Sequence, residues 1–313
     1  MNGWAVAIGQ PVLTLAVAPL LIGWMRLVRA RLEGRAGAGI GQPWRDLWKL
    51  VRKEPISPTD AGWLFAWAPP VLIATSLLIA AVAPLASTAS VAGGSVDLIA
   101  VVGLLLLGTV ALALAALDTG TAFGGMGASR EMTIAALVEP TVLLAVFALS
   151  ARAGSTSLAA IVDAGITHPD RLFSPASLLA AAALAIAVLA ETGRMPVDNP
   201  ATHLELTMVH EAMVLEYAGR DLALVELASA MRLSLLLGLL ANLFAPWGVA
   251  TTATWGALAV GVAVLLVKLT LLGGLLAAGE VLLAKVRLFR VPELLAGSFV
   301  LALLAVTASY VLA

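Results

Sequence analysis

Residues 98–117 read LIAVVGLLLLGTVALALAAL, twenty residues that contain no charge and no proline. A helix needs about 20 mostly apolar residues to cross a bilayer, so this stretch is long enough to span one. The rest of the chain has the same character, because 61% of its 313 residues are hydrophobic and 12% are charged, about half the charged share of an ordinary soluble protein. The sequence therefore predicts an all-α, multi-pass membrane protein.

Seven further apolar stretches bring the predicted number of spans to eight. Residues 1–25 carry no charge and no basic segment precedes them, so we expect a retained span rather than a cleaved signal peptide. The remaining six fall within 61–96 before a turn at Pro84, at about 132–151, 172–190 and 222–245, in 233–267 after a break at 245–248, and at 294–313. The sequence GGMG at 124–127 is predicted to be a flexible loop.

Basic residues are unevenly distributed between the predicted loops. Short cytoplasmic loops are enriched in Lys and Arg, and most basic residues fall in 26–60, in 191–221 and in other loops on the same side. Only Arg152 and Arg171 fall on the opposite side. We therefore expect both termini on the outer side, and a single integral membrane domain over 1–313 with large cytoplasmic loops at about 26–60 and 191–221.

Composition excludes several classes of function. Lys and Arg number 18 against 19 Asp and Glu, so the net charge of −1 offers no basic surplus for nucleic acid. The chain has no cysteine, which rules out disulfides, thiolate catalysis and Cys-held iron–sulfur clusters. A zincin motif beginning at His210 would need its second histidine at Val214, so no metal motif is complete. We expect no catalytic residue, metal or cofactor in this chain.

Ionisable residues nevertheless lie within the predicted spans. Glu139 falls about two turns into the fourth span, beside Pro140. A charge at membrane depth costs roughly 3 kcal/mol, so such residues normally face protein or water and mark ion or proton pathways. The structural alternative is a protonated Glu139 that only bonds a neighbouring helix. Lys268, in the middle of the seventh span, is a candidate counter-charge.

The second cytoplasmic segment begins ETGRMPVDNPATHLE at 191–205. Asn199-Pro200 is a good N-cap followed by a good first helical residue, so we expect a helix to start there. At 100° per residue, one face of this helix would carry His203, His210 and Tyr217, and the opposite face Glu205 and Glu216. These faces fit either a proton relay, because histidine titrates near neutrality, or a polar docking helix.

Both cytoplasmic loops carry motifs that resemble one known family. The first contains GQPWRDLWKL at 41–50 followed by Lys53-Glu54, and the second contains PVDNPATHLELTM at 196–208 and EYAG at 216–219. With the span count and orientation, these motifs resemble the membrane subunit shared by respiratory complex I (its H or ND-one type) and by membrane-bound nickel–iron hydrogenases of the formate hydrogenlyase and hydrogenase-4 type. The second loop is similar to the hydrogenase branch.

The resemblance implies partners and residue roles. It implies docking on hydrogenase-like large and small soluble subunits, which hold the nickel–iron centre and the iron–sulfur clusters, and contact with antiporter-like membrane subunits. The implied proton pathway comprises Glu139, Glu191, Asp198, Glu205 and Glu216, tuned by Arg194. Candidates for relay or counter-charge are His203, His210, Glu211 and Lys268. The first-loop residues implied in docking are Gln42, Pro43, Arg45, Asp46, Lys49, Lys53 and Glu54.

Four functions stay open on these grounds. The leading one is an anchoring and proton-coupling subunit of a hydrogenase complex in a prokaryotic inner membrane. The second is the quinone-site subunit of a complex I-like NADH:quinone oxidoreductase, against which the hydrogenase-like second loop argues. The third, from another class, is a stand-alone secondary transporter using Glu139 and Lys268, although large charged loops favour a docked partner. A purely structural anchor is the fourth, and it leaves the intramembrane acids without a role.

Overall fold

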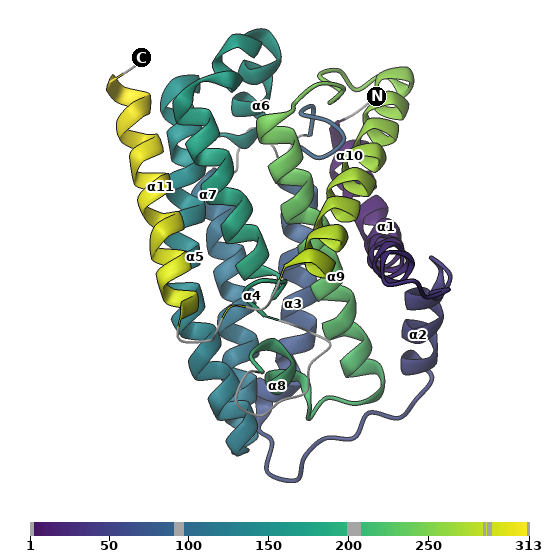
Figure 1. Cartoon of the computed structure of the whole chain (residues 1–313). Coiled ribbons are helices and arrows are strands. Elements are labelled where there is room, and N and C mark those ends of the chain that lie inside the picture. The colour runs from purple at the N-terminus through teal and green to yellow at the C-terminus, as the bar shows by residue number, and fades with distance from the viewer. Residues whose placement is uncertain (1–2, 91–96, 199–207, 284–285, 287–289, 312–313) are drawn as a thin grey trace.

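The computed structural model describes residues 3–90, 97–198, 208–283, 286 and 290–311 (Figure 1). Within these residues the chain is helical, with two isolated β-bridges and no strand, so the predicted all-α fold is confirmed. The elements are α1 (Gly3–Leu32), α2 (Gln42–Val51), α3 (Trp63–Val82), α4 (Leu98–Asp118), α5 (Ala122–Ala153), α6 (Leu158–Thr167), the 3-10 helix η1 (Pro169–Phe173), α7 (Pro175–Glu191), α8 (His210–Val214), α9 (Gly219–Phe244), α10 (Trp255–Leu282) and α11 (Val291–Val311).

Seven of the described helices are long and apolar enough to cross a membrane, namely α1, α3, α4, α5, α9, α10 and α11. The predicted fifth span, 172–190, corresponds to α7, which has 17 residues. At 1.5 Å per residue α7 is about 25 Å long, the lower limit for a crossing, and it runs alongside α5 and α11 (Figure 1). The multi-pass architecture is confirmed, whereas the orientation of the termini stays a prediction from the basic residues.

α5 is longer than the predicted fourth span. It begins at Ala122, so residues 124–127 are helical and the prediction of a flexible loop there was wrong. A Cβ on Gly124 would lie 2.4 Å from the Ala116 carbonyl oxygen, and one on Gly127 would lie 3.0 Å from the Met213 side chain. These glycines therefore allow α5 to pack closely against α4 and α8. The first span is also longer than predicted, because α1 continues to Leu32.

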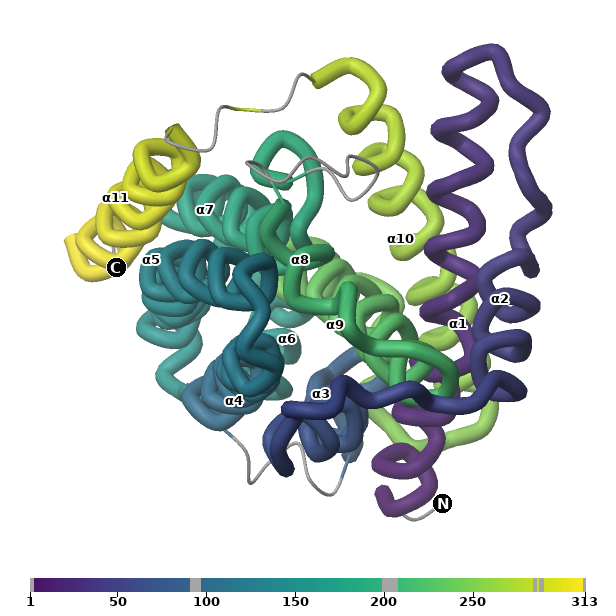
Figure 2. Tube along the Cα trace, turned by 90° about the horizontal axis from the view of Figure 1, so that it is seen from below, coloured from purple at the N-terminus to yellow at the C-terminus, as the bar shows by residue number. Residues whose placement is uncertain are grey.

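The bundle is arranged around α9. This helix contacts α1, α2, α3, α6, α7 and α10. Figure 2 shows α4, α5, α7 and α11 gathered on one side, with α1, α2 and α10 together on the other. Because α9 touches both groups, polar side chains on it can face cavities on either side.

A buried polar network closes one end of the bundle. Gln10 of α1 accepts hydrogen bonds from the backbone N–H groups of Leu85, Ala86 and Ser87, at 3.2, 2.9 and 3.4 Å. Asn242 of α9 donates to the Pro84 carbonyl at 2.8 Å. These bonds satisfy the backbone groups that are exposed where α3 ends, which is required inside a membrane protein. The predicted turn at Pro84 is therefore confirmed.

Candidate functional site

A cavity of about 490 Å³ lies between α1, α2, α9, the end of α10 and the segment that follows α7. Its walls carry many charged groups, which distinguishes it from the apolar interior of the bundle. The ionisable lining residues are Arg26, Arg29, Asp46, Arg194, Asp198, His210, Glu211, Glu226 and Glu280. The predicted site residues Asp198, Arg194, His210 and Glu211 therefore converge on one place.

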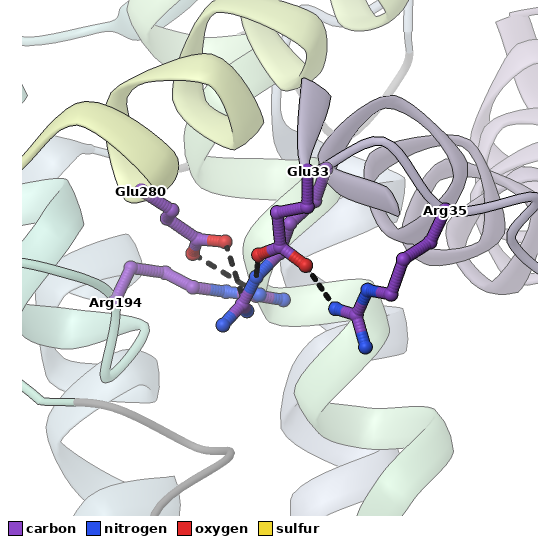
Figure 3. Close-up of polar contacts among 5 residues, drawn as sticks. Glu33, Arg35, Arg194 and Glu280 are labelled. Atoms are coloured by element: carbon purple, nitrogen blue, oxygen red, sulfur yellow. Dashed lines mark hydrogen bonds and ion pairs between the residues drawn. The ribbon is translucent and has the colours of Figure 1, made fainter. Parts of the chain in front are cut away.

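Glu280 joins three elements at the wall of this cavity. Its carboxylate is buried near the end of α10 and lies 3.4 Å from Arg194 Nη1 and 3.6 Å from Arg29 Nη1 of α1. Arg29 also contacts Glu33 at 3.3 Å, and Glu33 pairs in turn with Arg35 (Figure 3). A buried carboxylate with two guanidinium partners is well compensated, so this cluster fixes the segment after α7 against α1 and α10.

The segment after α7 is held by backbone as well as by charge. Gly193 adopts φ +57°, in the left-handed region that glycine tolerates at the end of a helix. The N–H of Val286, beyond α10, donates to the Pro196 carbonyl at 3.0 Å. Asp198 is 4% exposed, so it is buried close to the cavity wall. Arg194 and Asp198 are therefore placed by a tight turn rather than by a long loop.

A second, smaller pocket of about 40 Å³ extends from the cavity toward the interior of the bundle. Both are lined by Thr192, His210 and Ser229, so they are contiguous at these residues. The inner pocket also reaches Glu131 of α5, Glu191 at the end of α7, and Arg232 of α9. Ionisable groups thus extend inward from the cavity.

Arg232 organises the inner pocket. Its Nη2 donates to the Glu191 carboxylate, to Thr109 Oγ1 at 2.6 Å and to the Leu105 carbonyl at 3.0 Å. Its Nε is buried and meets no hydrogen-bond partner among the described residues. The Glu191–Arg232 pair links the end of α7 to the middle of the bundle, while one N–H of the guanidinium is left unused within the described chain.

Glu139 of α5 lines neither cavity but is buried in the bundle. It is 7% exposed, and both of its carboxyl oxygens are buried without a hydrogen-bond partner among the described residues. Glu139 interacts electrostatically with Glu191 and Arg232. This placement agrees with the prediction that Glu139 is buried at membrane depth. The alternative, in which Glu139 only forms a hydrogen bond to a neighbouring helix, finds no such bond within the described part of the chain.

His210 lies between the cavity and the inner pocket. Burial, and then the positive charge of Arg232, lower the pKa of His210 from 6.5 to about 4, so the ring is neutral at pH 7. The predicted continuous helix carrying His210 and Tyr217 on one face was wrong in its described part. Helix α8 ends at Val214, before Tyr217, because the chain turns there to begin α9.

Lys268 does not meet an acid among the described residues. Its Nζ donates to Asn242 Oδ1 at 2.9 Å, within the polar network that closes the bundle beyond α3. Within the described residues an amide oxygen therefore takes the place of the expected acid, and the candidate counter-charge role of Lys268 gains no support. Its position in the middle of α10 does agree with the predicted seventh span.

The two loop motifs meet in space. Tyr217 stacks on Phe65 with ring centroids 4.1 Å apart and donates to the Phe65 carbonyl at 3.0 Å. Gly219, at φ +58°, packs so closely against the first loop that a Cβ there would lie 2.5 Å from the Glu54 carbonyl oxygen. Glu216, in the same motif, is only partly buried and is not among the residues that line either cavity.

The first-loop residues divide into two groups. Pro43 is buried and, with Asp46, faces the cavity; Asp46 accepts a hydrogen bond from Gln42 at 2.9 Å. The exposed members, which a partner could contact, are Arg45, Lys49, Lys53 and Glu54. His203 and Glu205 lie outside the described residues.

Several residues that build the site lie outside the proton pathway predicted from the sequence. Arg232, Glu280, Arg29 and Glu131 have no place in the predicted pathway, yet they line the two cavities. The available signal was the rarity of charges within spans: Arg232 and Glu280 each lie in an apolar helix and each required a buried opposite charge. Within the described ranges no three His, Asp or Glu side chains are grouped as metal ligands.

Residues 5–311 match the family described as NADH dehydrogenase. The chain is 36% identical to Hydrogenase-4 component C of Escherichia coli K12, over 96% of this chain and 93% of the relative. It is 33% identical to Formate hydrogenlyase subunit 4 of the same strain, over 95% of each. Its fold resembles a chain of the archaeal membrane-bound sulfane sulfur reductase, with a TM-score of 0.82 at 21% identity over 98% of this chain and 99% of that one.

Proposed function

Because the chain belongs to the NADH dehydrogenase family of membrane subunits, we propose that it anchors a membrane-bound nickel–iron hydrogenase complex and couples its electron transfer to proton movement. The similarity over nearly the whole length to hydrogenase-4 component C and formate hydrogenlyase subunit 4 supports the hydrogenase branch. The relatives are proteins of E. coli, which is consistent with the inner membrane of a prokaryote.

One observation carries the coupling role. Ionisable groups line the 490 Å³ cavity and the adjoining inner pocket, where Glu191 pairs with Arg232, and the buried Glu139 interacts electrostatically with that pair. Ionisable residues at membrane depth are costly and mark ion or proton pathways. A purely structural anchor would gain nothing from a carboxyl that finds no hydrogen-bond partner among the described residues at this depth.

Arg232 can switch between two carboxylates in this proposal. Its Nε–H and the two oxygens of Glu139 are complementary, and all of them are buried without a partner in the described part of the chain. While Arg232 is paired with Glu191, an ionised Glu139 would be an uncompensated buried charge, so Glu139 holds a proton. When Arg232 turns toward Glu139, that carboxyl releases its proton and Glu191 accepts one from the cavity side. One proton enters and one leaves in each exchange.

The docked partner would drive this exchange electrostatically. Reduction of a redox centre in the partner adds negative charge beside the cavity, where Arg194 and Glu280 lie 3.4 Å apart. At an effective dielectric constant near 20, one charge about 10 Å away acts with roughly 1.7 kcal/mol, which biases such a pair. The nickel–iron centre and iron–sulfur clusters belong to the partner subunits, and this chain supplies the proton path.

The exposed first-loop residues provide the proposed docking surface for the soluble subunits. Arg45, Lys49, Lys53 and Glu54 are exposed on or beside α2, a helix whose other residues line the cavity. Antiporter-like membrane subunits would receive the protons. The stand-alone transporter gains no support. Lys268 donates a hydrogen bond to Asn242 and is not among the ionisable residues that line the two cavities.

A quinone-site subunit is the second candidate, and the size of the cavity favours it. A volume of about 490 Å³ falls within the range of small-molecule sites. The chemistry of the cavity argues against it, because the many ionisable groups in the wall are poorly suited to hold the apolar ring of a quinone. Inhibition of the complex by quinone analogues would favour this candidate, and indifference to them would favour the hydrogenase.

The proposed function is tested by gentle purification of the tagged chain from its native membrane. We expect a nickel-containing large subunit and an iron–sulfur small subunit to co-purify, and the preparation to evolve hydrogen from reduced viologen. Isolation of the chain alone, or with a quinone reductase that evolves no hydrogen, would contradict the hydrogenase assignment.

A further inference from the structure

At the end of the bundle opposite the charged cavity, two arginines converge. Arg152 ends α5 and Arg171 lies in η1, just before α7. They are the only two basic residues that the charge distribution assigns to the outer side of the membrane. Although nineteen residues separate them, each donates to the backbone of the other: Arg152 Nη1 to the Arg171 carbonyl at 3.1 Å, and Arg171 Nη1 to the Arg152 carbonyl at 3.3 Å.

Neither of these like charges forms an ion pair with an acid of the described chain. Among the described residues no carboxylate lies within 4.0 Å of either guanidinium. Asp170 is exposed beside Arg171, and the nearby Asp163 accepts a hydrogen bond from Thr88 at 3.0 Å. Two adjacent cations without a counter-charge raise the local potential and attract an anion.

The surroundings of the pair suit an amphiphile. Both arginines line a pocket of about 40 Å³, and its other walls are mostly apolar, with Leu149, Ile161 and Leu243 among them. One water needs roughly 10–15 Å³ by this measure, so the pocket has room for a phosphate group but not for an acyl chain. Beside it Phe173 stacks on Trp247, and both rings are exposed. Aromatic rings of this kind mark the headgroup level of a bilayer.

The start of α7 completes the site. Ser174 caps this helix, accepting from the Ser177 N–H, and Arg152 donates to the Ser174 hydroxyl. The N-terminus of a 17-residue helix adds a partial positive charge at the same point. One turn further along, Leu178 is 58% exposed, so an acyl chain can lie along the outside of α7.

We propose that Arg152 and Arg171 bind the phosphate of an anionic membrane lipid in the outer leaflet. The two guanidinium groups contact the phosphate oxygens, and the acyl chains extend along α7. A net negative headgroup is preferred over a zwitterionic one, because the site brings two positive charges together and neither forms an ion pair among the described residues. This proposal is independent of the coupling role, since it concerns the opposite end of the bundle.

The test is native mass spectrometry of the detergent-purified complex with added phosphatidylglycerol or phosphatidylcholine. Arg171→Gln removes an exposed guanidinium and leaves the Arg152 bonds to Ser174 and Ser177 intact. We expect the intact protein to retain phosphatidylglycerol in preference to phosphatidylcholine, and Arg171→Gln to weaken that binding by about tenfold, the usual cost of a lost charge-assisted hydrogen bond. Arg31→Gln, an exposed arginine at the other end of the bundle, is the matched control and should bind as before.

Three results would overturn the proposal. The first is equal retention of the two lipids by the intact protein. The second is unchanged phosphatidylglycerol binding in both Arg171→Gln and Arg152→Lys. The third is displacement of the bound lipid by millimolar inorganic phosphate, because the ligand would then be free phosphate rather than a lipid.

Discussion

Arg232 and Glu191 show how one ion pair can both stabilise a membrane bundle and serve its function. Each is a charge within a largely apolar environment, and each compensates the other. The energetic value of such a pair lies less in the attraction than in the penalty of leaving one partner buried alone. This asymmetry makes single and double substitutions informative.

Arg232→Gln should destabilise the protein by about 3–5 kcal/mol, because Glu191 remains buried without a cation. The double variant Arg232→Gln with Glu191→Gln should recover most of this loss, since two neutral amides can bond each other. Thermal unfolding of the purified complex, followed by intrinsic fluorescence, measures both. A double variant as unstable as the sum of the single variants would show that the two side chains do not act as a pair.

His210 predicts a specific dependence of stability on pH. Its pKa is about 4 when folded and 6.5 when not, so the unfolded chain binds more protons between these values. The contribution of neutral, buried His210 is therefore complete above pH 6.5 and is lost as the pH falls toward 4. His210→Gln should unfold with a weaker pH dependence in this window than the parent does.

The matched control for this experiment is His168→Gln, a histidine exposed at the other end of the bundle. It should leave the pH profile of the thermal midpoint unchanged. If His210→Gln and the parent lose stability in parallel between pH 6.5 and 4, the burial of His210 is not the source of the acid sensitivity.

At the scale of elements, glycine positions fix how the helices and loops meet. Gly219 begins α9 and lies against the backbone of the first loop. Gly154 is also in the left-handed region, at φ +69°, but a Cβ added there would have no described neighbour within 4 Å. The two residues have similar backbone conformations but different surroundings. They form a natural pair for separating conformational strain from packing.

Gly154→Ala should cost roughly 1–2 kcal/mol, the strain of a left-handed alanine. Gly219→Ala should cost more, because its methyl group would also collide with the Glu54 carbonyl and separate the two loops. The thermal midpoint of the complex and the fraction of the chain that assembles with its soluble partners measure the difference. Equal effects of the two substitutions would argue that the contact between the loops contributes nothing.

The elements were predictable from the sequence to different degrees. Long uncharged runs located the spans well, because crossing a bilayer imposes a minimum length and excludes charges. The prediction of a loop at 124–127 was wrong, because glycine is equally compatible with a turn and with a close contact between helices. The helix predicted in the second cytoplasmic segment ends before Tyr217 in its described part. The chain turns there, and Gly219 lies against the first loop.

The sequence indicated several residues that lie near the two cavities, but it did not indicate which residues they contact. Glu139, Glu191, Asp198 and Arg194 were recognised from rare buried charges and loop motifs, and the structure brings them close to two contiguous cavities. The partners of Glu191 and Arg194, which are Arg232 and Glu280, belong to distant helices. No periodicity within one helix can reveal which group on another helix a charge meets, so the Asn242 partner of Lys268 could not be predicted.

On the scale of the whole molecule, the two ends of the bundle have different chemistry. One end holds the large charged cavity and the loops, while the other holds the arginine pair and exposed aromatic rings. Between them, Glu139 lies buried in α5 and interacts electrostatically with Glu191 and Arg232. This polarity fits a subunit that receives an electrostatic signal at one face and passes protons within the membrane.

The most direct test of the coupling role is to measure hydrogen evolution and vesicle acidification together in inverted membrane vesicles that carry the assembled complex. In Glu139→Gln, hydrogen evolution should continue near the parental rate, because the docked redox centres are untouched, while acidification falls to background. Glu293→Gln, an exposed acid at the start of α11, should retain both activities. Normal acidification in a hydrogen-evolving Glu139→Gln complex would contradict the account.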